Sequence, residues 1–188
     1  MRIISGKFKG KLISFVKSSS TRPLKDSVKE STFNIITHSN LIDVTLEKST
    51  ILDLYSGIGS FGLECLSRGA NETVFVERDK SIAKTLYKNL LALSIKNEAT
   101  IINEDIIIFL KKKNIIKKFD ILFLDPPFAS NNFLKDLKLI KQEKIYKTNH
   151  LVVIHREKKS FDNFEDILNP IVIREYGRSK IIFAKFLT

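Results

Sequence analysis

The tetrapeptide Asp125-Pro126-Pro127-Phe128 follows a short apolar run at 121–124, which is typical of a buried strand. Two prolines end a strand because neither has an N–H group to donate to the sheet ladder. The turn therefore places a carboxylate, free carbonyls and an aromatic ring at the carboxyl end of a strand, where open α/β sheets bind ligands. The alternative is an ordinary strand-ending turn with no function.

This turn has the groups needed to hold an exocyclic amine of a nucleobase. Such an amine is a poor nucleophile because its lone pair is delocalised into the ring. Hydrogen bonds from its two N–H groups to Asp125 and to the Pro126 carbonyl would aim the lone pair at a methyl donor and favour the pyramidal transition state. Phe128 would stack on the base and fix its plane. The chemistry requires neither a strong base nor a metal.

A second motif, Gly57-x-Gly59-x-x-Gly62, has the spacing of a dinucleotide-binding turn, and Glu77 lies 20 residues after Gly57. Glycines let the backbone approach a ligand closely, and an acid at this distance can pair with ribose hydroxyls. This pattern suits NAD, FAD and S-adenosylmethionine alike. The alternative is a tight strand-to-helix turn that binds no ligand.

Two features favour S-adenosylmethionine over a nicotinamide cofactor. Asp53 lies in the strand before the glycine turn, where a carboxylate repels a pyrophosphate but suits an ammonium or sulfonium cation. The Asp-Pro-Pro-Phe turn has no clear role in a nicotinamide site. Asp105 follows a third strand and can accept a hydrogen bond from an adenine amino group. It can also cap the next helix, and the two roles are compatible.

The chain of 188 residues carries a net charge of +11, and residues 1–30 alone contribute +6 of it. A basic segment favours a nucleic-acid partner, and here it includes Lys7, Lys9, Lys11 and Arg22. The alternative is a general compositional bias toward lysine. Other lysines are interpreted as solvated helix faces, namely Lys111, Lys112, Lys113, Lys135, Lys138, Lys141, Lys144 and Lys147.

The composition also excludes several classes of protein. A single cysteine, Cys65, allows neither an internal disulfide nor a cysteine zinc site, and we expect it to be buried. The three histidines are scattered and do not form a metal-binding pattern. No apolar run approaches the roughly 18 residues of a membrane helix, and the first residues lack the apolar core of a signal peptide. We therefore expect a cytoplasmic globular protein.

Strand and helix patterns alternate from residue 49 onward, which predicts a doubly wound, mostly parallel α/β sheet of Rossmann-like type. Before them, residues 2–15 suggest a basic β-hairpin, and Asp26 can cap a helix that ends near His38. Strands are expected at 51–54, 73–76, 100–102, 121–124 and 151–154, helices at 60–67, 82–93, 106–113 and 133–145, and a final antiparallel hairpin at 171–175 and 180–186.

The chain resembles the bacterial 16S ribosomal RNA guanine-N2 methyltransferases that modify guanine 966, over nearly its whole length. The resemblance is carried by MRIISGKFKGKL at 1–12, Arg22-Pro23, VKESTFN at 28–34, DLYSGIGSFGLE at 53–64, SRGA at 67–70, Glu77, residues 125–128 and Tyr176-Gly177. The segment from Arg22 to Asn34 and the N-terminal residues are its more specific part. Leu24 departs from the family, where threonine follows Arg-Pro.

The resemblance implies a class I methyltransferase fold with a seven-stranded sheet, in one domain with a basic extension at 1–25 and a catalytic core at 26–188. It implies that S-adenosylmethionine is bound by Asp53, Tyr55, Gly57, Gly59, Glu77, Asp105 and Ile106. It implies that the target guanine is held by Asp125, Pro126, Pro127 and Phe128, and that 16S ribosomal RNA is held by Lys7, Lys9, Lys11 and Arg22. The expected protein is a monomer that acts on small-subunit particles, with ribosomal proteins as transient partners and no metal.

Three other interpretations remain open. A DNA adenine-N6 or cytosine-N4 methyltransferase would use the same turn, although 188 residues leave no room for a domain that reads DNA sequence. A catalytically silent RNA-binding or ribosome-assembly factor would keep the fold without the activity. A nicotinamide oxidoreductase would use only the glycine motif.

Overall fold

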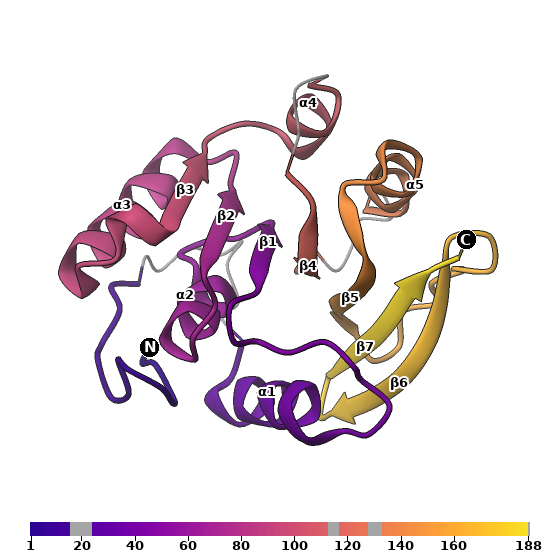
Figure 1. Cartoon of the computed structure of the whole chain (residues 1–188), viewed down its shortest axis with the longest axis horizontal. Coiled ribbons are helices and arrows are strands. Elements are labelled where there is room, and N and C mark those ends of the chain that lie inside the picture. The colour runs from indigo at the N-terminus through magenta and orange to yellow at the C-terminus, as the bar shows by residue number, and fades with distance from the viewer. Residues whose placement is uncertain (16–23, 113–116, 128–132, 188) are drawn as a thin grey trace.

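A computed structural model describes residues 1–15, 24–112, 117–127 and 133–187. Seven strands form one mixed sheet in the order β3-β2-β1-β4-β5-β7-β6 (Figure 1). The first five strands are parallel to one another, and β7 is antiparallel to both of its neighbours, β5 and β6. The strands are β1 (Thr50–Leu54), β2 (Glu72–Val76), β3 (Ala99–Ile102), β4 (Phe119–Leu124), β5 (Tyr146–Glu157), β6 (Leu168–Tyr176) and β7 (Ser179–Phe186).

Helices cover both faces of the sheet, as the doubly wound prediction requires (Figure 1). They are α1 (Asp26–His38), α2 (Ser60–Ser67), α3 (Lys80–Leu93), the short 3-10 helix η1 (Lys96–Glu98), α4 (Ile106–Leu110) and α5 (Phe133–Glu143). No helix in the described ranges is long and apolar enough to cross a membrane.

Alternation along the central strands divides the core between the two faces. Ile51 of β1 and Phe123 of β4 face α1, α2 and α3, whereas Leu52 and Leu122 face α4 and α5. Parallel strands that are buried on both faces consist of nearly continuous apolar residues. The apolar runs at 51–54 and 121–124 therefore predicted these two strands. The helix predicted at 82–93 corresponds to α3, and its apolar residues Ile82, Leu86, Leu90 and Leu93 are all buried.

Several element ends differ from the sequence predictions. β5 begins at Tyr146, five residues before the predicted start at 151. The added residues include 147–149, which are polar and exposed and therefore carry no apolar signal of a buried strand. Helix α5 ends at Glu143 and α4 ends at Leu110, both earlier than expected. The N-cap of α1 is Lys25, and Asp26 instead lies in the first turn, where its carboxylate accepts a hydrogen bond from Arg2 Nε at 3.1 Å.

The N-terminal segment turns back on itself, but with one isolated antiparallel bridge, Arg2 to Leu12, in place of a two-stranded hairpin. The Ile3 N–H donates to the Lys11 carbonyl at 3.0 Å, and the Ile13 N–H donates to the Met1 carbonyl at 3.0 Å. Between these bonds the chain follows tight turns, with hydrogen bonds from Lys9 N–H and Gly10 N–H to nearby carbonyls. The expected strands are therefore replaced by a compact loop.

Candidate functional site

The carboxyl ends of β2, β1 and β4 lie side by side and bring the predicted site residues together. The Ser56 N–H after β1 donates to the Val76 carbonyl at the end of β2 at 3.1 Å. On the other side, the Asp125 N–H after β4 contacts the Leu54 carbonyl at 3.4 Å. The connections after β1 and β4 lead to helices on opposite faces, so this is the topological switch point at which such sheets bind ligands.

The three glycines of the turn after β1 have different structural roles. Gly59 has φ +84° and is the N-cap of α2. At Gly62, an added Cβ would lie 2.4 Å from Phe75 Cε1, so this glycine allows α2 to pack on the sheet. At Gly57, which has φ +57°, no described atom lies within 4 Å of such a Cβ. The open space beside Gly57 is where a ligand can approach the backbone.

Two acids hold the glycine turn from either side. Asp53 Oδ2 accepts the Gly62 N–H at 2.9 Å, and Glu77 Oε2 accepts the Gly57 N–H at 2.9 Å. Glu77 Oε1 accepts the Asp79 N–H at 2.8 Å. The Asn103 side chain, at the end of β3, donates to the Glu77 carbonyl at 2.8 Å. The predicted glycine and acid motif is therefore one connected structure.

Asp53 gives the site its electrostatic character. Its side chain is buried, and its Oδ1 atom has no hydrogen-bond partner among the residues that the structure describes. Burial raises the pKa of Asp53, and repulsion from Asp125 and Glu77 raises it further, while the Gly62 N–H lowers it. Three carboxyl groups that influence one another in this way create a site that favours a bound cation.

Asp105, Ile106 and Tyr55 border the same region on the α4 and α5 side. Asp105 caps α4 as predicted, because its Oδ1 accepts the Ile107 N–H at 2.9 Å, and Ile106 is buried. Tyr55 has φ +58°, and its hydroxyl donates to the buried carboxyl of Asp136 on α5. Burial, followed by that hydrogen bond, raises the pKa of Tyr55 above its usual range. Tyr55 is therefore held by α5.

The sequence did not reveal the residues that fix the Asp-Pro-Pro turn. They are consecutive residues at the end of β5, His155 and Arg156, which point to opposite faces of the strand and are both buried. His155 Nδ1 lies 2.8 Å from Asp125 Oδ1, and Arg156 Nη1 donates to the Pro127 carbonyl at 3.3 Å. No local sequence pattern links His155 to Asp125, which lies 30 positions earlier. The one feature that could have indicated the contact is that both residues follow apolar runs typical of neighbouring strands.

Phe128 and Arg22 lie outside the described residues, as does Pro23. The other three predicted RNA-binding residues, Lys7, Lys9 and Lys11, are exposed on the N-terminal loop. Lys29 contributes to the positive charge of residues 1–30 but is fully buried on α1. It is therefore part of the core rather than of a basic surface.

The N-terminal loop is attached to α2 by a buried carboxylate. Glu64 accepts hydrogen bonds from the Ile4 N–H at 2.8 Å, the Ser5 N–H at 3.0 Å and Arg68 Nε at 2.8 Å. Lys29 Nζ lies 3.7 Å from the same carboxylate and donates to the Arg2 carbonyl at 2.7 Å. At Gly6, an added Cβ would lie 1.8 Å from the Ser67 carbonyl oxygen, so the loop lies directly against the end of α2.

The same loop also contacts the glycine turn through α3. The side chain of Asn89 accepts the Ser14 N–H at 2.7 Å and donates to the Ser14 carbonyl at 3.2 Å. It also donates to the carbonyl of Ile58, within the glycine turn, at 3.3 Å. The basic loop and the glycine turn are thus joined by one buried side chain.

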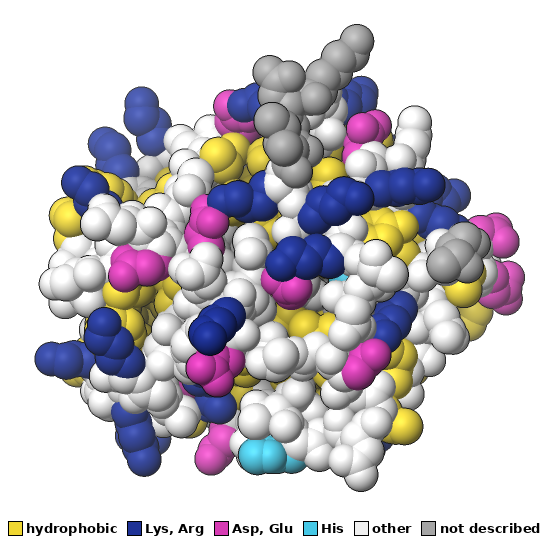
Figure 2. Space-filling view, in the orientation of Figure 1, with side chains coloured by type: hydrophobic (Ala, Val, Ile, Leu, Met, Phe, Trp, Pro, Cys, Tyr) yellow, Lys and Arg dark blue, Asp and Glu magenta, His cyan; other side chains and the backbone are white. Residues whose placement is uncertain are grey.

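Positive side chains are not confined to the N-terminal loop. Figure 2 shows Lys and Arg side chains across one whole face, mixed with Asp and Glu. Some are paired, such as Lys147 with Asp120 at 2.7 Å. Lys135 and Lys138 are exposed on α5, which agrees with their interpretation as solvated helix positions, whereas Lys144 follows the end of α5 and Lys147 lies in β5, so the helical interpretation of these two was wrong.

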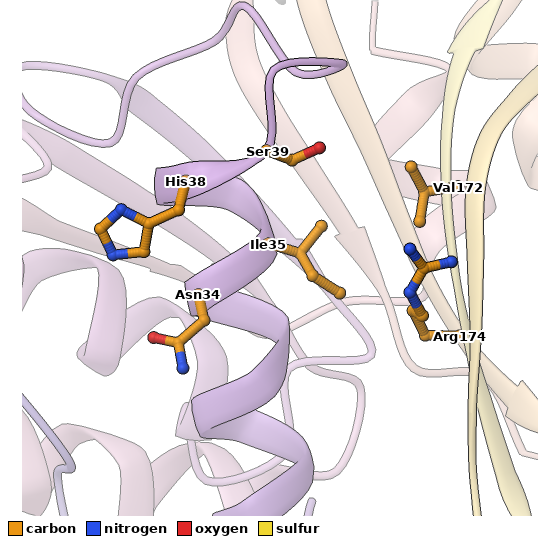
Figure 3. A pocket seen from close by; sticks show the side chains of 6 residues that line it. All are labelled: Asn34, Ile35, His38, Ser39, Val172 and Arg174. Carbon is orange, nitrogen blue, oxygen red and sulfur yellow. The ribbon is translucent and has the colours of Figure 1, made fainter.

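One further depression, of about 430 Å³, lies between α1 and β6 (Figure 3). The side chains of Ile35 and Arg174 extend into it from the two elements. None of the predicted site residues lines it. It is therefore separate from the site at the strand ends.

Comparison with known proteins agrees with the resemblance. The model of the family described as Conserved hypothetical protein 95 matches residues 1–185. Ribosomal RNA small subunit methyltransferase D of Haemophilus influenzae is 36% identical over 159 residues, which cover 84% of this chain and 79% of that protein. The protein of the same name from Buchnera aphidicola is 32% identical over 187 residues, which cover 100% and 91%.

A solved structure supports the same relationship. The Haemophilus influenzae protein HI0767 superposes with a TM-score of 0.78 at 30% identity and covers 100% of this chain and 98% of its own. Sequence and fold thus agree over the full length of the chain. The chain belongs to the family of Conserved hypothetical protein 95 and of the ribosomal RNA small subunit methyltransferases D.

Proposed function

We infer that the chain is an S-adenosylmethionine-dependent methyltransferase that methylates the exocyclic N2 amine of a guanine in 16S ribosomal RNA. The observation that carries this inference is the fixed Asp-Pro-Pro turn beside the glycine turn, in a chain of this family. The turn supplies acceptors for an amine, and the neighbouring carboxyl groups suit a cationic methyl donor.

The residues at the glycine turn fit S-adenosylmethionine. The space beside Gly57 admits a ligand next to the backbone, and Glu77, which follows β2 and accepts the Gly57 N–H, is assigned to the ribose hydroxyls. Asp53 is buried beneath the turn and is joined to it by the Gly62 N–H, so it adds negative charge close to the site of a cationic ligand. When bound, this cofactor supplies an electrophilic methyl group on a sulfonium sulfur.

We propose that Asp125 and the Pro126 carbonyl orient the guanine amine. His155 occupies Oδ1 of Asp125, which leaves Oδ2 to accept an N–H from the substrate. The hydrogen bonds turn the nitrogen lone pair toward the methyl group and stabilise the positive charge that develops on nitrogen. The methylated nitrogen then loses a proton readily, so the turn orients and stabilises without acting as a strong base. Phe128 is assigned to stacking on the base.

A pair of glycine substitutions tests the cofactor side of the site. Gly62→Ala is expected to lower stability by about 1–3 kcal/mol, because its Cβ would collide with Phe75. Gly57→Ala has open space for the Cβ, so its positive φ alone is expected to lower the free energy of unfolding by about 1–2 kcal/mol. The same substitution is expected to weaken S-adenosylmethionine binding strongly, because the Cβ occupies the space that the ligand needs. Urea unfolding and isothermal titration measure the two quantities. Unchanged cofactor affinity in Gly57→Ala would remove this residue from the binding site.

We propose that Lys7, Lys9 and Lys11, with Arg22, hold the substrate RNA. Reversing the charge of the three lysines is expected to weaken RNA binding and to reduce the slope of log K against log salt, because fewer counterions are released. The matched control reverses Lys80, Lys84 and Lys88, which are exposed on α3 and change the net charge equally. Equal losses in both triple variants would mean that net charge, and not this loop, determines binding.

We further propose that a monomer acts on small-subunit particles in the cytoplasm, where ribosomal proteins border the target. Methyl transfer from tritiated S-adenosylmethionine to particles and to naked 16S RNA compares the two forms of substrate. Faster transfer to particles is the expected result. Transfer to neither form would contradict the proposed function, and faster transfer to naked RNA would contradict only the need for assembly.

A further inference from the structure

The loop between β5 and β6, residues 158–167, contains one phenylalanine whose side chain is exposed to solvent. The side chain of Phe161 is 92% exposed, although it lies three residues before Phe164. Phe164 packs edge-on against Phe133 of α5 at 6.3 Å between ring centroids. The loop thus packs one ring, that of Phe164, partly buried against the core and presents the other to solvent.

Both neighbours of Phe161 are anchored. The Ser160 hydroxyl donates to Asp162 Oδ2 at 2.6 Å, and Lys180 Nζ donates to the Ser160 carbonyl at 2.5 Å. The carboxylate of Asp162, only 1% exposed, pairs with Arg156 Nε at 3.0 Å and with Lys180 at 3.4 Å. The residues on either side of this exposed ring are therefore held by polar contacts.

Arg156, which pairs with Asp162, also contacts the Asp-Pro-Pro turn, called here the catalytic turn. Arg156, which binds Asp162 through Nε, donates from Nη1 to the Pro127 carbonyl at 3.3 Å, and its guanidinium lies 4.4 Å from the ring centre of Phe133. One buried arginine therefore ties the loop of Phe161 to the turn that contains Asp125. The exposed ring belongs to the same edge of the sheet as the proposed methyl acceptor site.

The surroundings of Phe161 suit an unpaired nucleotide. Lys158 and Lys159 precede it and are exposed, and Lys158 pairs with Glu175 at 2.7 Å. The Lys158 N–H donates to the Arg178 carbonyl at 2.7 Å, which brings the exposed Arg178 of the β6–β7 turn alongside. Proteins that hold single-stranded nucleic acid combine basic side chains with aromatic rings on which bases stack.

We propose that Phe161 stacks on an unpaired base of the substrate RNA next to the target guanine. This inference rests on the proposed function and adds a second aromatic contact to the one assigned to Phe128. Phe161 is thus a substrate-positioning residue, and Arg156 sets its position relative to the catalytic turn.

The test is steady-state methyl transfer to small subunits by Phe161→Ala, Phe161→Leu and Phe161→Tyr. Phe161→Ala is expected to raise KM for the RNA substrate roughly 5- to 150-fold, with unchanged S-adenosylmethionine affinity and unchanged Tm. Phe161→Leu keeps apolar volume without an aromatic face and should resemble Phe161→Ala. Phe161→Tyr keeps the ring and should lie within about twofold of the wild type. Leu41→Ala removes another exposed apolar side chain, 63% exposed after α1, and should change nothing.

Wild-type KM in Phe161→Ala, or full activity in Phe161→Leu, would overturn the stacking role while the proposed function stands. A wild-type protein that transfers no methyl group to small-subunit RNA would overturn the proposed function, and this inference with it. The two failures are therefore distinguished by the wild-type reaction alone.

Discussion

Replacing Asp125 with alanine is expected to lower the turnover of methyl transfer roughly 10²- to 10³-fold. The substitution removes the carboxylate that accepts an N–H of the target amine, and it leaves His155 without that partner. Cofactor affinity should change little, because the glycine turn is held by Asp53 and Glu77. Single-turnover transfer with saturating cofactor measures the chemical step, and isothermal titration measures the cofactor affinity.

Two control variants test whether the loss of turnover is specific to the acceptor oxygen of Asp125. Asp125→Asn keeps one carbonyl acceptor and should lose less activity than Asp125→Ala. Asp120→Ala removes a carboxylate at the opposite end of β4, where Asp120 binds Thr50 N–H and Lys147, and turnover should stay within a few fold of the wild type. A fully active Asp125→Ala enzyme would rule out Asp125 as the acceptor for the amine.

Glu64→Ala should be the most destabilising substitution on the N-terminal side of the molecule. It removes the acceptor for two loop N–H groups and leaves the buried ammonium of Lys29 without its carboxylate. Breaking a buried pair by removing one partner costs about 3–5 kcal/mol. Burial already lowers the pKa of Lys29, although Glu64 and Asp26 oppose that shift. Urea unfolding gives the change in the free energy of unfolding.

The control for Glu64 uses both partners of the pair. Lys29→Met removes the cation but leaves Glu64 bonded to Arg68, so its cost should be smaller. The double variant Lys29→Met, Glu64→Gln should recover part of the loss caused by Glu64→Gln alone. Glu175→Gln, which breaks an exposed pair with Lys158, should stay within about 1 kcal/mol of the wild type. A cost of Glu64→Ala as small as that of Glu175→Gln would show that the loop does not depend on this carboxylate.

The sequence predicted the parts of the site that are encoded locally. The turn of Gly57 to Gly62 and the Asp-Pro-Pro turn are determined by backbone freedom and by missing N–H groups, which are properties of the residues themselves. The apolar runs at 51–54 and 121–124 predicted the strands β1 and β4, because parallel strands covered on both faces are almost continuously apolar. The spacing of Glu77 predicted an acid that serves the same site as the glycine turn, whereas its hydrogen bond with the Gly57 N–H was not predicted.

The parts that the sequence did not predict depend on contacts between distant residues. Lys29 is counted as a surface charge in the sequence, and only the fold places it against Glu64. His155 and Arg156 acquire their roles because β5 pairs with β4. The N-terminal loop lacks two strands because the N–H groups of Ile4, Ser5 and Lys7 bond to Glu64 and Ser67 of α2 instead of across the loop.

The most direct test of the central claim is nucleoside mass spectrometry after methyl transfer to small subunits, naked 16S RNA and duplex DNA. The predicted result is N2-methylguanosine from the RNA or the particles, absent when Asp125→Ala replaces the wild type. Methylated adenine or cytosine from the DNA would contradict the claim and assign the turn to a DNA methyltransferase. Cofactor binding without transfer to any of the three substrates would contradict it in favour of a silent RNA-binding factor.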